Sequence, residues 1–306
     1  MRVAVYRSAV PAKAKNEFKR TMLTAFAQGV AAAGDAVEIV DAYHTVDCDI
    51  AVMQGWVGMK SGPHLALRQQ IIDQQRHQQR HVMVIDSNLY GFLAPEDFNR
   101  YLRYSLDGIF PTTGYYFDSA VDRSRWPAIA ASYDFQERPW RQSGKRIVIC
   151  LQRSGGWSMD GQAILDWLAR TVATIQAHTD RPIMIRAHPG SVSIVPDVRR
   201  QHPAIKISNS ADLRQDLDGT WATVTYNSSP GVASLLWGIP AFVTDPVPQR
   251  SQAWPWANTD LGQIESPLMP DRTEFYHKIA QCHWLTADLA SGAAWRFFKD
   301  RLPVRH

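Results

Sequence analysis

Polar or glycine-rich segments follow three apolar runs in the second half of the chain, and their residue types suit a phosphate-bearing ligand. Glycines let the backbone approach a ligand, a guanidinium forks onto phosphate oxygens, and free N–H groups at a helix start attract anions. The segments are Arg153-Ser154-Gly155-Gly156, Arg186-Ala187-His188 and Tyr226-Asn227-Ser228-Ser229-Pro230-Gly231. Because ligands bind beyond the carboxyl ends of parallel strands, we expect these segments to share one anion site.

Each segment also has a plain structural interpretation. The first is neither a GxGxxG fingerprint nor a Walker loop, so it could be an ordinary strand-to-helix turn. A lone histidine such as His188 is more often structural than functional, although Arg186 lies two residues before it on the same side of a strand. Ser228 or Ser229 would serve as an N-cap in front of Pro230. The combination of three such segments is what favours ligand binding.

The first half of the chain offers a candidate catalytic base. Asp86 comes directly after the apolar run 82–85, where partial burial would raise the pKa of its carboxyl group toward that of a useful base. The alternative is that Asp86 caps the turn that follows it. Asp49 and Asp107 are other candidates for the base.

Side chains near the ends of other predicted runs could contact an acceptor molecule. They combine hydroxyl and amide groups with aromatic rings, whose flat faces stack on sugars or bases. The predicted acceptor-binding residues are Gln54, Trp56, Asn88, Thr112, Thr113, Tyr115, Arg250 and Trp254. The segment 245–256 is rich in proline and tryptophan, which predicts a rigid loop able to close over a donor or an acceptor.

Metal and membrane signals are lacking in the sequence. Cys48, Cys150 and Cys282 are far apart and in no metal-binding spacing, which indicates buried thiols in a reducing compartment. No apolar run approaches the roughly 20 residues that span a bilayer. Arg7 and Lys13 interrupt any signal-peptide pattern near the start. We therefore expect a cytoplasmic protein with no metal, no bound cofactor and no membrane partner.

Apolar runs alternate with helical patterns along most of the chain, which predicts an α/β fold with parallel strands and crossover helices. The expected strands are 2–6, 37–40, 50–53, 81–85, 146–151, 182–187, 205–207, 220–225 and 241–244. The expected helices are 15–33, 65–79, 160–177, 232–237, 274–283 and 287–301. The stretch 118–144 contains Pro127 and Pro139 without a sustained period, and is expected to be a linker.

Two α/β halves joined by a linker predict two Rossmann-like domains. A chain of 306 residues with 45% hydrophobic and 20% charged residues is ordinary for a soluble protein of this size. We place the domains at residues 1–140 and 141–306, with the final helices packing back on the first domain. Their parallel sheets are expected to face each other across a cleft, the donor on the second domain and the acceptor and base on the first.

Two motifs carry a resemblance to a known family. IRAHPGS at 185–191 and VTYNSSPGVASLLWGIPAFV at 224–243 resemble the C-terminal nucleotide-sugar domain of GT-B glycosyltransferases, in particular the capsule-polysaccharide (Kdo transferase-like) group. The resemblance covers about residues 147–250. It implies a GT-B fold, a nucleotide-sugar donor contacted by His188 and the 226–231 segment, and no need for a metal.

One position departs from the family pattern. Where the family has Glu-Ala after the glycine, with the glutamate often bound to ribose hydroxyls, this chain has Ala233-Ser234. Either Ser234 or another residue makes that contact, or the donor differs from the family's usual one.

A second resemblance indicates which molecule accepts the sugar. The segments 85–90, 101–114 and 245–261 resemble glycosyltransferase-like proteins of bacteriophages, and a net charge of +4 suits a phosphate-rich partner. We therefore expect a metal-independent glycosyltransferase that modifies a 5-hydroxymethylpyrimidine of phage DNA in the host cytoplasm, with Arg100, Arg103 and Arg250 contacting the strand. The alternatives are a capsule-polysaccharide transferase, a non-catalytic nucleotide- or glycan-binding protein of this fold, and an epimerase.

Overall fold

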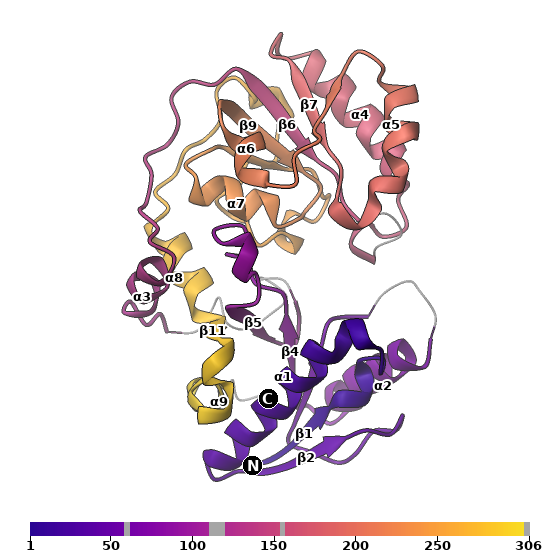
Figure 1. Ribbon diagram of the computed structural model, residues 1–306, viewed down its shortest axis with the longest axis vertical. Coiled ribbons are helices and arrows are strands. Elements are labelled where there is room, and N and C mark those ends of the chain that lie inside the picture. Colours follow the sequence, from indigo (N-terminus) through magenta and orange to yellow (C-terminus); the bar gives the residue numbers. More distant parts are fainter. Residues whose placement is uncertain (58–61, 110–119, 154–156, 303–306) are drawn as a thin grey trace. The chain divides into compact units, whose positions relative to one another are not determined.

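The computed structural model describes residues 1–57, 62–109, 120–153 and 157–302. The chain divides into two compact units, each built on its own β-sheet (Figure 1). The first unit comprises Met1–Gly91, Glu96–Arg125 and His277–His306, and the second comprises Phe92–Pro95 and Trp126–Tyr276. The sequence patterns predicted a division of the chain after residue 140, with the final helices packing back on the first domain. The second unit begins earlier than that division, and residues from His277 onward belong to the first unit.

The first unit contains a six-stranded sheet in the order β2-β1-β3-β4-β5-β11. Its strands are β1 (Arg2–Tyr6), β2 (Ala36–Val40), β3 (Ile50–Gln54), β4 (His81–Asp86), β5 (Tyr101–Leu106) and β11 (His283–Leu285). The first four are parallel, whereas β5 runs antiparallel to both β4 and β11. An order of 2-1-3-4-5 places the ligand-binding switch point between β1 and β3.

Helices cover both faces of this sheet, so alternate residues of one strand serve two cores. The helices of this unit's layers are α1 (Glu17–Ala32), α2 (Pro63–His77) and α9 (Ala293–Lys299). Val5 of β1 packs with Phe26 of α1 and Trp295 of α9 on one face. Tyr6, the next residue, packs with Leu67 of α2 on the other. This alternation of buried residues explains why the apolar runs of β1, β3 and β4 are continuous.

The last helix, α9, is attached to the first unit through Asp35. The carboxylate of Asp35 accepts from Nε1 of Trp295 at 2.7 Å and from Nζ of Lys299 at 2.8 and 2.9 Å. Desolvation opposes ionisation, but hydrogen bonds from Lys299, the N-terminal amine and Trp295 outweigh it and lower the pKa of Asp35 to about 2. Gly29 of α1 permits a close approach, because an added Cβ would clash with the carbonyl oxygen of Leu289.

The second unit contains a fully parallel five-stranded sheet in the order β8-β7-β6-β9-β10. Its strands are β6 (Arg146–Cys150), β7 (Ile183–Arg186), β8 (Lys206–Ile207), β9 (Thr220–Thr225) and β10 (Ala241–Val243). In chain order this is 3-2-1-4-5, the order of dinucleotide-binding folds. Ligands in such sheets bind beyond the carboxyl ends of the strands where the order reverses, which is between β6 and β9.

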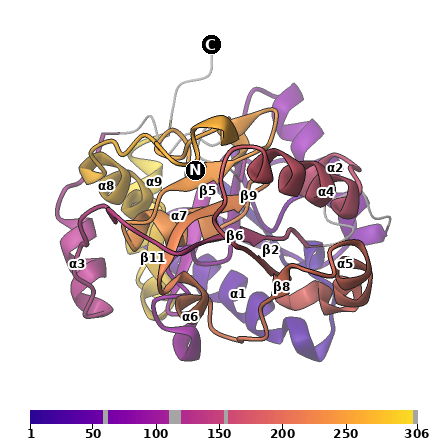
Figure 2. The ribbon, with the colours of Figure 1, turned by 90° about the horizontal axis from the view of Figure 1, so that it is seen from above.

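The helices of the second sheet lie on two opposite faces (Figures 1 and 2). They are α4 (Ile164–Gln176), α5 (Val195–Gln201), α6 (Leu213–Leu217) and α7 (Pro230–Leu236). Ile149 of β6 packs with Leu168 of α4 and Val198 of α5. Its neighbour Cys150 packs with Leu213 of α6 on the opposite face, where α7 lies against β9 and β10. The sheet is therefore buried on both sides.

Several segments differ from the sequence expectations. The stretch expected to be a linker contains α3 (Arg125–Ser132), and the helix expected at 274–283 is α8 (Thr273–Gln281), followed at once by β11. β5 was not predicted at all, because Arg103 and Ser105 interrupt its apolar pattern although both are buried. Within the described ranges, no helix is long and apolar enough to cross a membrane.

Candidate functional site

Arg153 and His188 meet beside Gly190, past the carboxyl ends of β6 and β7. A Cβ added at Gly190 would lie 3.3 Å from the His188 ring and 3.4 Å from Nε of Arg153. Because glycine has no side chain, the space between Gly190 and these two side chains stays unfilled. Arg153 is exposed and has no hydrogen-bond or ion-pair partner in the part of the chain that the structure describes. Its cation is therefore available to a ligand.

The hydrogen bonding of His188 determines which ring nitrogen carries the proton. The backbone N–H of Gly190 donates to Nδ1 at 2.9 Å, so the neutral ring holds its proton on Nε2. Burial, and secondarily the cation of Arg153, lower the pKa of His188. The ring therefore offers a neutral N–H donor next to a guanidinium. A hydrogen-bond donor next to a positively charged side chain is an arrangement that binds anions.

The two serines before α7 do not cap that helix. Ser229 occupies the N-cap position and Pro230 the first helical position, as the sequence indicated, but the Ser229 side chain makes no capping hydrogen bond. The hydroxyl oxygen of Ser228 is buried and has no partner among the described residues. Simple side-chain capping was the alternative interpretation of these serines, and it is wrong.

Asn227 connects three strand ends and has no group left over for a ligand. Its Nδ2 donates to the carboxylate of Asp245 at 2.7 Å and to the carbonyl of Ser158 at 2.9 Å. Its Oδ1 accepts from Nε2 of Gln152 at 2.6 Å, and the residue is 1% exposed. This geometry argues against the predicted donor contact by Asn227 and for a role in holding the loops after β6, β9 and β10 together.

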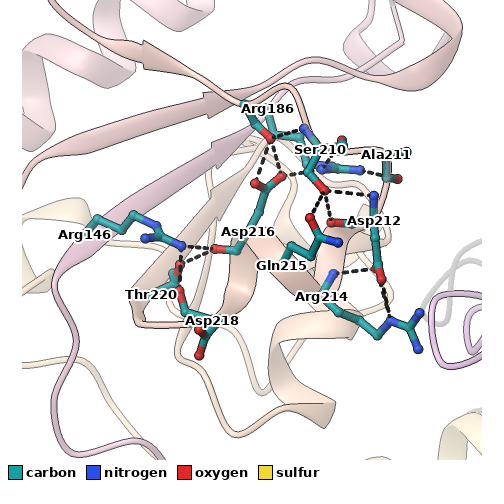
Figure 3. A network of polar contacts seen from close by, with 11 residues as sticks. Arg146, Arg186, Ser210, Ala211, Asp212, Arg214, Gln215, Asp216, Asp218 and Thr220 are labelled. Carbon is teal, nitrogen blue, oxygen red and sulfur yellow. Dashed lines mark hydrogen bonds and ion pairs between the residues drawn. The ribbon is translucent and has the colours of Figure 1, made fainter.

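Arg186 belongs to a buried polar network at the edge of the sheet (Figure 3). Its guanidinium forms an ion pair with Asp216 and donates to the carbonyls of Ser210 and Ala211, each at 3.0 Å. Asp216 also accepts from the hydroxyl of Ser208 at 2.7 Å. These partners lie within the protein, so the structure argues against the phosphate contact that the sequence predicted for Arg186. The network instead anchors the segment before α6.

Tyr226 and Gly231 also serve packing. Tyr226 is 4% exposed, and its ring meets Trp167 edge-on at a centroid distance of 6.1 Å. Gly231 is buried, and an added Cβ would lie 3.3 Å from Cβ of Ala253. The role expected for Gly231, to let the backbone approach a ligand, does not fit this close packing.

Ser234, which stands in place of the family's alanine next to the missing glutamate, is fully buried. Its hydroxyl accepts from Thr223 Oγ1 at 2.6 Å and donates to the carbonyl of Pro230 at 2.8 Å. The side chain faces the sheet, so it is not placed to contact a ribose. Of the sequence alternatives, two remain: a ribose contact from another residue, or a donor that differs from the family's usual one.

Asp86 ends β4 beside a buried arginine of the neighbouring strand. Arg103 stands directly opposite in the antiparallel register, and its Nη2 donates to Oδ2 of Asp86 at 2.9 Å. The N–H of Ser87 donates to Oδ1 at 2.8 Å. The side chain of Asp86 is 28% exposed, whereas that of Arg103 is 3% exposed. The carboxylate is thus oriented by a cation and a turn, not surrounded by apolar groups as the sequence suggested.

Three predicted acceptor contacts lie near this carboxylate's end of the sheet. Gln54 ends β3 and is 6% exposed, with an Oε1 that has no partner within the described residues. Trp56 is half-buried. Asn88 is buried and shapes a turn, because its Oδ1 accepts from the N–H of Tyr90 at 2.8 Å. Its amide therefore holds the backbone, which argues against an acceptor contact.

The other predicted acceptor contacts are in the second unit or outside the described residues. Arg250 forms an ion pair with Asp160, and Trp254 is partly exposed. The predicted residues outside the described ranges are Thr112, Thr113, Tyr115, Ser154, Gly155 and Gly156. In the described ranges, no group of three or more His, Cys, Asp or Glu side chains is placed to hold a metal ion.

Comparisons with known proteins find structural similarity only. A scan against protein-family models and a search of curated proteins give no match. The solved structure of Thermosulfurimonas dismutans KpsC, beta Kdo 2,4 transferase, matches 92% of this chain and 90% of its own, with a TM-score of 0.55 and 16% identity. T. dismutans KpsC, beta Kdo 2,7 transferase, matches 76% and 75% respectively, with a TM-score of 0.47 and 15% identity.

The first of these similarities extends over nearly the whole chain, and so includes both Rossmann-like sheets. The chain has the GT-B fold. The fold predicted from the motifs at 185–191 and 224–243 is confirmed. At 16% identity the similarity concerns the fold alone, so the chemistry of this GT-B chain has to be argued from its own residues.

Two polar residues at the sheet edges of this GT-B chain were missed by the sequence analysis. Arg68 of α2 donates to the carbonyl of Ala9 at 2.9 Å and to that of Trp56 at 2.9 Å, bridging the loops after β1 and β3. Burial lowers the pKa of Arg68. Gln152 follows β6 and is 4% exposed. The high Gln, His and Arg content of 65–79 was the only signal for Arg68, and Gln152 was hidden beside the more prominent Arg153.

Proposed function

We propose that this protein is a glycosyltransferase that moves a sugar from a nucleotide-sugar to an acceptor hydroxyl. The observation that carries the proposal is the convergence of Arg153 and the His188 ring beside Gly190, at the carboxyl edge of a doubly wound sheet, with the proton of the neutral ring on Nε2. A cation and a pre-oriented N–H donor stabilise the negative charge that develops on a departing phosphate. The GT-B fold supports this assignment.

In the proposed reaction, Asp86 acts on the acceptor. Its carboxylate accepts the proton of an acceptor hydroxyl while that oxygen forms a bond to the anomeric carbon. The bond between the anomeric carbon and the phosphate oxygen breaks, and its electron pair stays on the phosphate near Arg153 and His188. The nucleotide-sugar is a substrate, and the proposal includes neither a metal ion nor a further cofactor.

We propose a glycan hydroxyl as the acceptor rather than a base of phage DNA. Binding to DNA requires cations that are free to replace the counterions of phosphates. The three arginines expected to contact a DNA strand are each paired with a carboxylate of the protein: Arg100 with Asp97, Arg103 with Asp86, and Arg250 with Asp160. The structural similarity to a Kdo transferase also favours a glycan.

The donor site is tested by calorimetry with UDP, GDP, ADP and CMP. We expect at least one of them to bind, and Arg153→Ala or His188→Ala to weaken that binding about tenfold or more, because each removes a contact to charge. Arg199→Ala is the matched control, since Arg199 is an exposed arginine on α5. Equal affinities of wild type and both site variants would overturn the assignment of this site.

The acceptor is tested by mass spectrometry after incubation with a panel of nucleotide-sugars. One arm contains DNA with 5-hydroxymethylcytosine or 5-hydroxymethyluracil, and the other contains capsule oligosaccharides. We expect added sugar mass on the oligosaccharide. Fluorescence anisotropy at two salt concentrations provides a second measurement, because binding to duplex DNA would weaken with a slope of about −0.9 per phosphate contact in a double-logarithmic plot. Sugar added to the DNA would overturn the glycan assignment.

A further inference from the structure

The orientation of the Gln152 side-chain amide is determined by a chain of hydrogen bonds. The carboxylate of Asp245 and the carbonyl of Ser158 only accept, so the group of Asn227 that faces both must be its NH2. The Oδ1 of Asn227 therefore faces Gln152 and accepts from Nε2 at 2.6 Å. A second proton of Nε2 is donated to the hydroxyl of Ser158 at 2.9 Å. Both amide protons of Gln152 are thus used within the protein.

The remaining atom of this amide, Oε1, has no donor. It is buried and has no hydrogen-bond partner among the described residues, although a buried carbonyl is almost always paired. Gln152 is 4% exposed and follows β6, the strand at which the sheet order reverses. Thr225 Oγ1 and Ser228 Oγ, at the end of the neighbouring strand β9, are also buried without a partner. Three unpaired oxygens therefore occur where a ligand is expected.

Whether each of these protein atoms donates or accepts a hydrogen bond determines which ligand group can pair with it. A phosphate has only acceptor oxygens at neutral pH, so it pairs with the adjacent Arg153 and with the N–H of His188 but not with Oε1 of Gln152. Oε1 needs a group that donates. A nucleotide carries such groups in its ribose hydroxyls and in the N–H groups of its base.

We propose that Gln152 is a specificity-determining residue of the donor site, whose side-chain carbonyl accepts a hydrogen bond from a ribose hydroxyl or a base N–H of the bound nucleotide. The inference rests on the proposed function and adds the selection of one ligand group to it. It also assigns a contact of the kind that Ser234 is not placed to make.

The test compares wild type with Gln152→Met, which has similar length and no acceptor oxygen. The probes are UDP, GDP, ADP and CMP, their 2′-deoxy and 3′-deoxy counterparts, and for each nucleotide a counterpart whose base N–H groups are methylated, such as N3-methyl-UDP. We expect wild type to bind one parent nucleotide roughly tenfold more tightly than the analogue lacking the donor group, because that analogue leaves Oε1 unpaired. Gln152→Met should bind the two alike. The deoxy probes report a ribose hydroxyl, and the N-methylated probes report a base N–H.

Ser158→Ala is the matched control. It removes one partner of Nε2 but leaves Oε1 unchanged, so it should keep the selectivity of wild type. Selectivity is a ratio of two affinities measured on one preparation, so it does not depend on the fraction of folded protein. If Gln152→Met does not fold, the wild-type comparison still decides: a wild type that binds every analogue like its parent overturns the inference.

The failures of the two proposals are distinguishable. Nucleotide binding with the same selectivity in wild type and Gln152→Met overturns the role of Gln152 alone. An ordered water that donates to Oε1 in a nucleotide-bound crystal structure does the same. If none of the four nucleotides binds wild type, both this inference and the proposed donor site are overturned.

Discussion

At the scale of single residues, some polar side chains are buried and hydrogen-bonded within the protein, and others remain available to a ligand. Arg153, the ring of His188 and the Ser228 hydroxyl retain hydrogen-bonding capacity that the described structure does not use. Arg186 and Asn227 have the same polar character in the sequence, but their donors are directed at protein atoms. Chemical type alone therefore does not identify the site.

Asp86→Asn should lower turnover by a factor of about 10² or more while leaving nucleotide affinity unchanged. An amide does not accept the acceptor proton, and general base catalysis contributes on this order. Asp86 belongs to the first unit, whereas Arg153 and His188 belong to the second. Steady-state kinetics and calorimetry measure the two quantities. Asp49→Asn is the control, because Asp49 is partly exposed and accepts from the backbone N–H of Arg2. A large loss of turnover in Asp49→Asn instead would move the base to that residue.

Ser228→Ala should weaken nucleotide binding several-fold without lowering the free energy of unfolding. The Ser228 hydroxyl makes no hydrogen bond in the described structure, so its removal leaves no protein partner unpaired. Urea unfolding and calorimetry test the two parts. Unchanged affinity would remove this serine from the site, and a clear loss of stability would show that its hydroxyl has a structural partner.

For the elements, the connection between α9 and the start of the chain rests on a buried carboxylate. Asp35 joins Trp295 and Lys299 of α9 to the segment between α1 and β2. Apolar packing of Trp295 against Phe26 adds to this connection, with a centroid distance of 6.2 Å. An apolar stripe alone would allow α9 to slide, whereas the directional bonds to Asp35 set its register.

Asp35→Asn should destabilise the first unit by about 1–3 kcal/mol at pH 7, the usual cost of losing hydrogen bonds to a charged group. The pKa of Asp35 is lowered to about 2, so its contribution is complete above the unfolded value near 4 and is lost as the pH falls toward 2. Urea unfolding at several pH values should show the gap between wild type and variant closing in that range. Asp300→Asn, an exposed neighbour, should show no gap. A gap that stays constant down to pH 2 would contradict the role of this charge.

At the scale of the whole molecule, the protonation state of the buried His283 affects the stability of the first sheet. Its Nε2 accepts from the N–H of Leu89 at 3.0 Å and its Nδ1 lies 2.8 Å from the carbonyl of Ile279, so only a neutral ring satisfies both. Desolvation is the main cause that lowers its pKa to about 3, and Arg103 and Arg125 add to it. Protonation would place a charge in the buried interior, beside Leu89 and Ile279 of α8.

Stability of the first unit should therefore fall as the pH drops from about 6.5 toward 3. The unfolded chain takes up a proton near pH 6.5 that the folded chain does not, which costs up to about 1.4 kcal/mol per pH unit for one group. His283→Gln should be less stable at pH 8 but show a flatter dependence below pH 6.5. Urea unfolding from pH 8 to pH 4 measures both slopes. Parallel slopes for wild type and variant would assign the acid sensitivity to other groups.

Most of the fold could be predicted from local sequence patterns. The runs at 2–6 and 220–225 form β1 and β9 with the expected bounds, because a strand buried on both faces is a continuous apolar run whatever it packs against. β5 was not predicted because Arg103 breaks that pattern; the burial of Arg103 is compensated by its ion pair with Asp86 on the neighbouring strand. β11 was not predicted because it has only three residues and follows a helix, which is too short a run for a recognisable strand pattern.

The sequence could predict the region of the candidate site, but not which of its side chains contact a ligand. Strand ends, a Pro after two serines and a His-Pro-Gly turn are local signals, and all of them lie at the carboxyl edge of the second sheet. Which side chains face a ligand depends on partners far away in the sequence: Gln152 meets Asn227 across 75 positions, and Arg186 meets Asp216 across 30. A hydrogen bond once made inside the protein is not available outside it. Only the tertiary structure decides where those bonds are made, and so which polar residues remain for chemistry.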